Sequence, residues 1–235
     1  MAGEVRVNGQ VVTKAGMKVS AESEITLANI MPYVGRGGFK LAGALDQFPI
    51  DVTGRACADV GACTGGFTDV MLQNGAARVF AIDVGYGQLD WKLRSDDRVT
   101  VMERTNARYI ETLETPVSFV AIDVSFISLK LILPAVKKWL TPEFDIVALI
   151  KPQFEAGKKQ VGSGGVVRDP AVHQSVLESI LNWCVGNHLH PYGLAKSSIQ
   201  GSDGNVEFLV WLKAEGSAEI AHLIAGVLGS SIDSQ

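Results

Sequence analysis

The sequence of 235 residues lacks the features that mark membrane, secreted and metal-binding proteins. Its three cysteines, Cys57, Cys63 and Cys184, have neither a metal-ligand spacing nor the even number typical of a disulfide framework. It has no signal peptide pattern, and no apolar run approaches the roughly 18 residues of a membrane helix. We therefore expect a cytoplasmic protein with reduced thiols, no metal and no membrane span.

An excess of positive charge is also missing. The formal net charge is −4, from 21 Lys and Arg against 25 Asp and Glu. This balance disfavours a protein that coats nucleic acid unspecifically, but it leaves room for an enzyme with a local basic face. Glycine, in contrast, is abundant at 25 residues and gathers in a few segments. Such clusters favour tight loops around a ligand.

Short apolar runs alternate with helical periodicity along most of the chain, which predicts a doubly wound α/β sheet. Residues 1–28 read as a separate piece of short strands with turns at Asn8-Gly9 and Ala15-Gly16, and residues 29–35 as a linker. Residues 36–235 form the predicted main domain. Its expected strands are Cys57–Val60, Arg78–Ile82, Val99–Met102, Val117–Ile122, Phe144–Ile150, Tyr192–Ile199 and Val206–Lys213. Its expected helices are Gly38–Phe48, Gly66–Asn74, Gln88–Arg94, Leu129–Leu140, Ala171–Asn187 and Ala218–Leu228.

Only the segment SIQGSDGN separates the last two expected strands, so they should pair as an antiparallel hairpin at the sheet edge. The sequence thus predicts a Rossmann-like, mostly parallel sheet of seven strands whose last strand is antiparallel.

The strongest motif is DVGACTGGF at residues 59–67, where an apolar strand ends in an acidic residue and glycines follow. Asp83, 22 residues beyond Gly61, ends the next strand, where a carboxylate accepts hydrogen bonds from ribose hydroxyls. Nicotinamide-dinucleotide enzymes share this arrangement, but here Cys63 stands where their second glycine allows a pyrophosphate to approach. S-adenosylmethionine has no phosphate, and its sulfonium favours a nearby carboxylate such as Asp59.

The motif ERTN, residues 103–106, follows the third strand at the position of an adenine edge, and the Asn106 amide offers a donor and an acceptor. The alternative for the DVGACTGGF, Asp83 and ERTN set as a whole is a structural glycine turn with a capping asparagine. The residues predicted to bind the cofactor are Asp59, Gly61, Ala62, Thr64, Gly65, Gly66, Phe67, Asp83, Val84, Asn106 and Asp123.

Four charged residues stand at the ends of expected elements, on the side where a doubly wound fold places its active site. Asp123 and Lys151 end apolar strands, Glu207 sits early in the strand NVEFLVWL, and Lys40 starts a helix. Each alone has a plain alternative as a surface charge. Together they suit methyl transfer to a ribose 2′-hydroxyl, which must be held in line and relieved of its proton.

This quartet resembles the Lys-Asp-Lys-Glu tetrad of the FtsJ-type ribose 2′-O-methyltransferases. The resemblance narrows to the TlyA (hemolysin A) branch through segments that cover most of residues 36–212. It implies an S-adenosylmethionine-dependent enzyme that methylates cytidine 2′-hydroxyls in ribosomal RNA of the ribosomal subunits. It also implies that Lys151 is nearest the proton transfer, while Asp123, Lys40 and Glu207 orient it and the hydroxyl. The segments are RGGFKL, DVGACTGGFTDV, IDVGYGQL, ERTN, DVSFISL, KPQFEAG, GGVVRDP and DGNVEFL.

Members of that branch carry an N-terminal S4 RNA-binding domain, and residues 2–27 look like its strand-rich second half alone. We expect that the chain begins inside this domain and lacks the basic helical front half. The glycine-rich segment Ala156–Val167 is expected to cap the site and touch RNA backbone, or else to be a plain solvated loop. The predicted RNA-binding residues are Arg6, Lys14, Lys18, Arg36, Lys158, Lys159 and Arg168.

Three other readings are weaker. A cytosine C5-methyltransferase needs a nucleophilic cysteine after the fourth strand, and IDVSFIS has none. Base N-methyltransferases use an Asp/Asn-Pro-Pro-aromatic turn there, and the segment from Asp123 to Phe126 lacks both prolines. A catalytically silent RNA-binding or hemolysin-like module would have no reason to keep all four tetrad positions. The sequence does not specify an oligomeric state.

Overall fold

The chain divides after Tyr33 into two units, Met1–Tyr33 and Val34–Gln235. The computed structural model describes residues 5–12, 14, 16–27, 31–201, 204–216 and 218–229. The boundary falls within residues 29–35, which the sequence predicts as a linker. The assignment of the first unit to an S4 domain stays a prediction.

A three-stranded antiparallel sheet with the order β2-β1-β3 forms the first unit. Asn8 and Gly9 join its first two strands with φ of 51° and 80°, the left-handed conformation that a two-residue hairpin turn requires. The Asn8 side chain also accepts a hydrogen bond from the Glu24 backbone N–H at 2.9 Å. Ala15, in the second predicted turn, lies outside the described residues. The strands are β1 (Val5–Val7), β2 (Gln10–Val12) and β3 (Ile25–Leu27).

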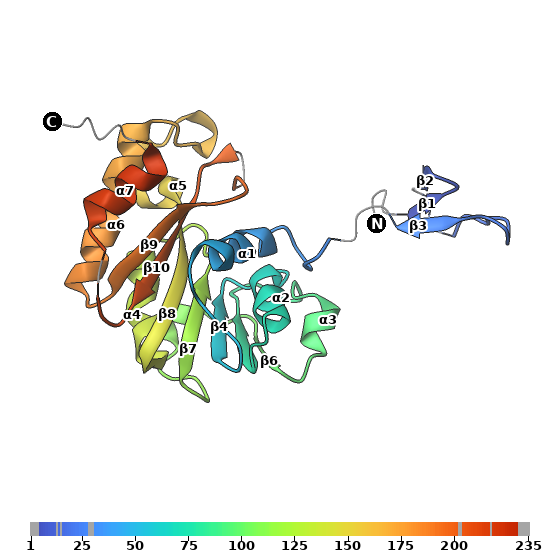
Figure 1. Ribbon diagram of the computed structural model, residues 1–235, viewed down its shortest axis with the longest axis horizontal. Helices are drawn as coiled ribbons and strands as arrows, with labels where there is room; N and C mark the ends of the chain where they lie inside the picture. Colours follow the sequence, from blue (N-terminus) through green and yellow to red (C-terminus); the bar gives the residue numbers. More distant parts are fainter. Residues whose placement is uncertain are drawn as a thin grey trace. The chain divides into compact units, whose positions relative to one another are not determined.

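The second unit is built on a seven-stranded sheet with the order β6-β5-β4-β7-β8-β10-β9 (Figure 1). Strands β4 to β8 are parallel, and β10 is antiparallel to both of its neighbours. This confirms the predicted sheet with its antiparallel last strand, although β10 lies inside the sheet and β9 forms the edge. The strands are β4 (Ala56–Val60), β5 (Arg78–Ile82), β6 (Val99–Met102), β7 (Val117–Ile122), β8 (Leu140–Ile150), β9 (His190–Lys196) and β10 (Phe208–Lys213).

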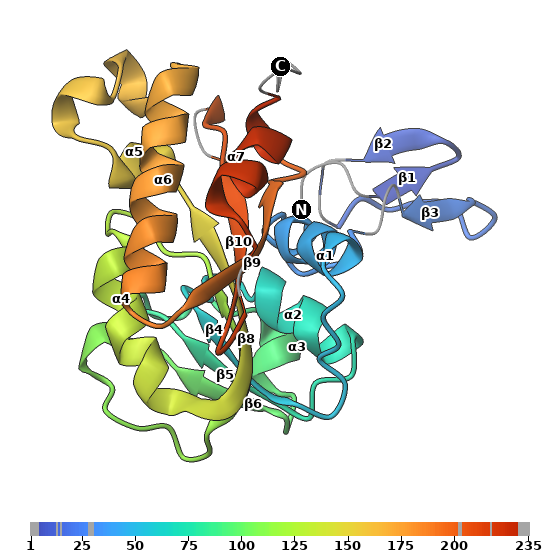
Figure 2. The same ribbon diagram turned by 60° about the vertical axis from the view of Figure 1, so that its left-hand side comes forward.

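Helices cover both faces of this sheet: α1, α2 and α3 lie on one side, and α4, α6 and α7 on the other (Figures 1 and 2). The third helix starts at Trp91 rather than at Gln88, because Asp90 caps it by accepting a hydrogen bond from the Lys92 N–H. The α-helices are α1 (Gly38–Gln47), α2 (Gly66–Gln73), α3 (Trp91–Arg94), α4 (Leu129–Val136), α5 (Pro152–Glu155), α6 (Pro170–Gly186) and α7 (Ile220–Leu228). Short 3₁₀ turns are η1 (Ala107–Tyr109), η2 (Lys137–Trp139), η3 (Lys158–Gln160) and η4 (Ser163–Gly165).

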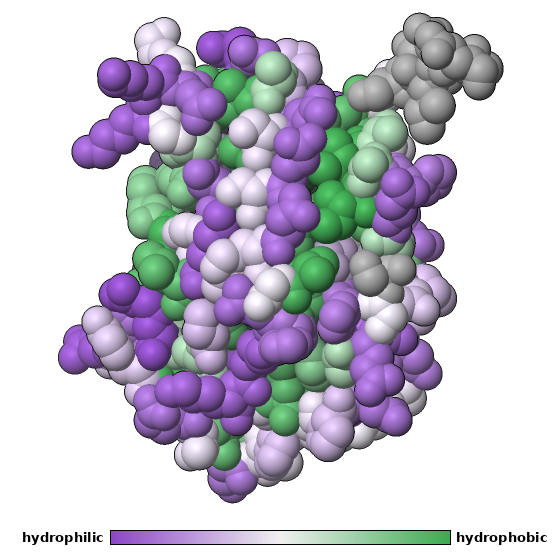
Figure 3. Space-filling view, turned by 90° about the vertical axis from the view of Figure 1, so that its left-hand side faces the viewer, coloured by the Kyte–Doolittle hydropathy of each residue, from purple (hydrophilic) through white to green (hydrophobic). Residues whose placement is uncertain are grey.

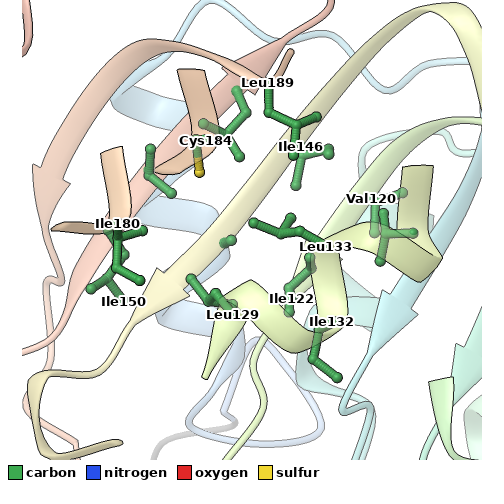
Figure 4. Close-up of a cluster of buried hydrophobic side chains, with 14 of the residues drawn as sticks. Val120, Ile122, Leu129, Ile132, Leu133, Ile146, Ile150, Ile180, Cys184 and Leu189 are labelled. Carbon is green, nitrogen blue, oxygen red and sulfur yellow. The ribbon is translucent and has the colours of Figure 1, made fainter. Parts of the chain in front are cut away.

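The core lies between the central strands and helices α4 and α6 (Figure 4). The end of β7 (119–122) and the end of β8 (146–150) are apolar on both faces because helices cover both, as expected for central parallel strands. Full burial of each such side chain stabilises the fold by about 1.5–3 kcal/mol, so the sheet is a firm base for groups at its edge. The labelled side chains are Val120, Ile122, Leu129, Ile132, Leu133, Ile146, Ile150, Ile180, Cys184 and Leu189.

The outer helices α6 and α7 form a mixed surface, where hydrophobic residues show between hydrophilic ones (Figure 3). Of the α7 residues only Ile224 is fully buried, so this helix covers the sheet edge loosely. Within the described ranges, no helix has the length and the hydropathy to cross a bilayer.

Candidate active site

The chain order of the sheet reverses between β4 and β7, and this opens a crevice beyond the carboxyl ends of the strands. Asp123 and Lys151 directly follow the adjacent parallel strands β7 and β8. Glu207 directly precedes β10, outside the strand in which the sequence placed it. Because β10 runs antiparallel to β8 and Phe208 pairs with Ile150, Glu207 arrives at the same edge of the sheet.

These charged residues form a chain of alternating sign that begins at Glu207. Lys40 Nζ, from the first turn of α1, lies 2.6 Å from Glu207 Oε2 and 3.5 Å from Asp123 Oδ2. Lys151 Nζ lies 2.6 Å from Asp123 Oδ1. The structure thus brings together all four residues that the sequence predicts as catalytic.

Burial of these four charged side chains lowers the stability that their ion pairs can contribute. Lys40, Lys151 and Glu207 are 8%, 7% and 2% exposed, while the Asp123 side chain keeps 19% of its surface. Desolvating two ammonium groups and two carboxylates costs free energy that their mutual attraction often does not exceed. Two positive and two negative charges at a cavity wall therefore indicate a functional site more than a stabilising device.

Ser125 is a member of the network that sequence reasoning missed. Lys151 Nζ donates a hydrogen bond to Ser125 Oγ at 3.0 Å. An ammonium has three donors, and within the described residues Asp123 and Ser125 occupy two of them. The third is free for a bound molecule. The segment DVSFIS held a signal for this role, since Ser125 follows Asp123 by two residues.

A second contact fixes Lys151 relative to Ser125. Glu155, in the helix that follows Lys151, accepts hydrogen bonds from Ser128 Oγ at 2.6 Å and from the Leu129 N–H at 2.8 Å. It thereby caps α4, and burial raises the pKa of its carboxyl against the effect of these bonds. The motifs KPQFE and DVSFIS are thus held to each other by side-chain contacts.

Two adjoining cavities of about 350 Å³ and 450 Å³ open beside the network. They share Gly61, Cys63, Asp123 and Ser125, and the first also contains Lys40 and Lys151. Of the residues predicted to bind the cofactor, the linings include Asp59, Gly61, Ala62, Thr64, Gly66, Phe67, Asp83, Val84, Asn106 and Asp123. Gly65 lines neither cavity, and a Cβ there would lie 2.2 Å from Leu93 Cδ1, so its place in the motif is explained by packing.

Asp59, inside β4, is almost fully buried at the wall of the first cavity. Its Oδ2 accepts hydrogen bonds from the Thr68 N–H at 2.8 Å and Thr68 Oγ1 at 2.7 Å. Burial raises the pKa of Asp59 to about 7, and the nearby charges of Asp123 and Asp83 add to this, while Thr68 opposes it. Among the described residues, no donor reaches Asp59 Oδ1. A buried acceptor without a partner suits a cationic ligand in this cavity.

Gly61 makes the crevice possible by its conformation. Residues with a side chain rarely adopt its φ of +89°, and a Cβ at this position would lie 2.3 Å from the Asp123 carbonyl oxygen. Only glycine lets the chain after β4 turn this close to the chain after β7.

Asp83 joins the loops that follow β4 and β5. Its Oδ2 accepts a hydrogen bond from the Cys63 N–H at 2.8 Å, and its Oδ1 accepts one from the Gly85 N–H at 2.6 Å. Asn106 caps η1 by accepting a hydrogen bond from the Arg108 N–H at 3.1 Å, so the capping alternative is present. It also lines the second cavity. Sequence reasoning missed Gln88, which lines this cavity as well.

The seven basic residues predicted to contact RNA are all exposed: Arg6, Lys14, Lys18, Arg36, Lys158, Lys159 and Arg168. Arg36 lines the first cavity together with Lys40. The other six line none of the cavities described here.

Part of the glycine-rich segment comes close to the network. Val161 and Gly165 line a third cavity that also contains Lys151 and Glu207. Asn205 holds the segment there, since its Nδ2 donates to the Gly165 carbonyl oxygen and its Oδ1 accepts from the Val167 N–H, each at 3.1 Å. The segment therefore forms one wall beside the network.

The model of the FtsJ-like methyltransferase family matches residues 33–214. The chain belongs to this family. It is 46% identical over 218 residues to the 16S/23S rRNA (cytidine-2′-O)-methyltransferase TlyA of Mycobacterium tuberculosis, which covers 91% of this chain and 81% of that protein. A crystal structure from Lactococcus lactis is 51% identical, with a TM-score of 0.81 over 85% of this chain and 98% of that one. An S-adenosylmethionine-dependent methyltransferase from Mesorhizobium loti shares the fold at 13% identity, with a TM-score of 0.56 over 76% of this chain and 100% of that one.

Membership of a methyltransferase family agrees with S-adenosylmethionine as the cofactor, which the sequence predicts. The lining fits this cofactor: within the described residues Asp59 Oδ1 is a buried acceptor without a partner, and Asp83 lines the second cavity just after a strand, the position from which a carboxylate accepts hydrogen bonds from ribose hydroxyls in such folds. In the part of the chain that the structure describes, no three His, Cys, Asp or Glu side chains gather as a metal site requires.

Proposed function

We propose that this chain transfers the methyl group of S-adenosylmethionine to the 2′-hydroxyl of a cytidine in ribosomal RNA. The observation that carries the proposal is the buried chain Glu207–Lys40–Asp123–Lys151 at the wall of the cofactor cavity. The choice of a ribosomal cytidine rests on the activity named for the M. tuberculosis relative. Such a substrate implies that the protein works in the cytoplasm.

A ribose hydroxyl is a poor nucleophile, so the site must hold it and remove its proton. When bound, S-adenosylmethionine supplies an electrophilic methyl group. Lys151 is the residue nearest the acceptor oxygen: after its ammonium has passed a proton to solvent, the amine takes the hydroxyl proton as the methyl group passes from sulfur to the ribose oxygen. The ammonium that results is stabilised by Asp123 Oδ1 at 2.6 Å.

The other groups of the network position this step. Glu207 holds Lys40, whose ammonium lies 3.5 Å from Asp123 and helps to orient that carboxylate toward Lys151. Ser125 fixes the direction of the Lys151 side chain. Orientation of this kind lowers the barrier because the reacting groups no longer have to find each other.

RNA binding is assigned to the exposed basic residues. Arg36 stands beside the cofactor cavity, where a phosphate next to the acceptor ribose would lie. Lys158, Lys159 and Arg168 stand in or beside the glycine-rich segment, which forms a wall of the third cavity. Residues 1–28, as the second half of an S4 domain, add Arg6, Lys14 and Lys18 as contacts that position the RNA without reading its sequence.

The test is to incubate the purified chain with labelled S-adenosylmethionine and unmethylated ribosomal subunits, and to identify the product nucleoside by mass spectrometry. We expect 2′-O-methylcytidine, absent with Lys151→Ala and present with the control Lys138→Ala, a surface lysine paired with Glu111. A methyl group on a base nitrogen would overturn the ribose assignment.

A further inference from the structure

The third cavity, of about 260 Å³, adjoins the catalytic network but is not used by the mechanism above. It shares Lys151 and Ser125 with the first cofactor cavity. Two cavities therefore meet at Lys151, where the acceptor hydroxyl is placed. The cofactor occupies the cavity that contains Asp59. The third cavity remains for the rest of the methyl acceptor.

Gln153 gives this cavity an unusual chemical feature. Its Oε1 is buried, and within the described part of the chain no donor reaches it. Gln153 lies in α5, two residues after Lys151, and lines the third cavity but not the other two. Buried carbonyl oxygens are nearly always hydrogen-bonded, so an unpaired one in a side chain that lines a cavity points to a donor that a ligand brings.

An aromatic surface lies next to this amide. The Phe154 ring lines the same cavity, and its centroid lies 6.0 Å from Lys151 Nζ. Phe126 supports it at a centroid distance of 4.9 Å. A flat ring beside a hydrogen-bonding group is the combination with which proteins bind an unstacked nucleobase.

We propose that this cavity binds the base of the acceptor nucleotide and that Gln153 Oε1 accepts a hydrogen bond from the exocyclic amino group of cytosine. The proposal rests on the function proposed above and adds the group that reads the base. Uracil carries a carbonyl oxygen where cytosine has its amino group, so it leaves the Gln153 oxygen without a donor. Lys151 selects the hydroxyl, and Gln153 selects the nucleoside.

The experiment compares methyl transfer to ribosomal subunits that carry either cytidine or uridine at the position that the wild-type chain methylates. We expect the wild type to prefer cytidine. In Gln153→Leu, kcat/KM on cytidine should fall between about fivefold and 150-fold, and the preference should drop toward one. Binding of S-adenosylmethionine should stay within about twofold, because Gln153 does not line the cofactor cavities.

Two further variants separate recognition from damage to the fold. Gln153→Glu has the same shape and still accepts a hydrogen bond, so it should keep more of the cytidine preference than leucine does. Gln174→Leu, an exposed glutamine on α6, should behave as the wild type. A Gln153→Leu enzyme with the wild-type cytidine preference would overturn the inference while leaving the proposed function intact. A wild type that methylates no ribose would remove both.

Discussion

Lys151 Nζ lies 2.6 Å from Asp123 Oδ1 because each residue directly follows one of two adjacent parallel strands, β7 and β8. The carboxyl ends of such strands meet at one edge of the sheet, so two side chains far apart in sequence become an ion pair. The pair stands between the cofactor cavity and the third cavity. Its position, more than its strength, makes it suitable for proton transfer.

Lys151→Ala should lower kcat by about 10²–10⁴, the usual contribution of a positioned acid or base. Cofactor affinity should change less than about twofold, since Asp59 and Asp83 remain in place. Lys151→Arg should be similarly inactive, because a guanidinium stays protonated and cannot take the hydroxyl proton. Single-turnover rates and calorimetric titration with the cofactor measure the two effects. An alanine variant with a tenth or more of the wild-type kcat would remove Lys151 from the mechanism.

Glu207→Gln should lower the free energy of unfolding by about 1.5–3 kcal/mol, as expected for a buried hydrogen bond between charged groups. Glu207 is 2% exposed and lies 2.6 Å from Lys40 Nζ, so the neutral amide leaves that ammonium poorly balanced. Urea denaturation measures the loss. The control Glu111→Gln breaks an exposed ion pair with Lys138 at the same distance and should cost about 0–1 kcal/mol. Equal losses in the two variants would show that the network contributes nothing beyond a surface pair.

Much of the site could be predicted because its residues sit at places that the chain itself marks. An apolar run that is followed by Asp123 or Lys151 indicates the end of a strand, and the carboxyl ends of parallel strands lie at one edge of the sheet. Gly61 likewise indicates a sharp turn after a strand, because such a turn needs glycine.

The rest depends on contacts between elements that are distant in sequence. The spacing of Ser125 from Asp123 marks the position of Ser125 but not its hydrogen bond to Lys151, and the capping of α4 by Glu155 has no local pattern. Packing against leucines from another segment explains the glycine at position 65, which the sequence predicts as a cofactor contact. Gln153 is distinguished only by its lack of a donor, which is a property of the folded cavity.

Asp59 should make both cofactor affinity and stability depend on pH near neutrality. Its pKa of about 7 means that the carboxyl is largely neutral at pH 6 and largely ionised at pH 8. A cationic cofactor prefers the ionised form, so its affinity should rise by up to about tenfold over this range. Asp59→Asn should remove the slope, whereas the control Asp96→Asn, at a partly exposed residue that lines neither cofactor cavity, should keep it. Titrations at several pH values test this, and a wild-type affinity without pH dependence would contradict it.

The same shift affects folding with a defined sign. The pKa of Asp59 is higher in the folded chain than its ordinary value of 3.8, so between these values the folded state binds more protons than the unfolded state. The free energy of unfolding contributed by Asp59 is therefore greatest below about pH 4 and declines as pH rises to about 7. The free energies of unfolding of wild type and Asp59→Asn, measured by denaturation without cofactor at several pH values, should differ in their pH dependence across this window. The same pH dependence in both proteins would show that Asp59 has an ordinary pKa in the folded chain.

Gly61→Ala should be among the most damaging small substitutions in the chain. The new Cβ meets the Asp123 carbonyl oxygen at 2.3 Å in a backbone conformation that is itself unfavourable, so β4 and β7 must separate at the crevice. We expect a loss of about 2–5 kcal/mol in the free energy of unfolding and a loss of cofactor binding.

Gly54→Ala is the matched control, because Gly54 has a φ of +70° but open space where the new Cβ would lie. It should cost only the conformational strain of about 1–2 kcal/mol and leave cofactor affinity unchanged. Denaturation and cofactor titration of the two variants separate strain from close approach. If both variants lost the same stability and both still bound the cofactor, the close approach of Gly61 to Asp123 would have no part in forming the crevice.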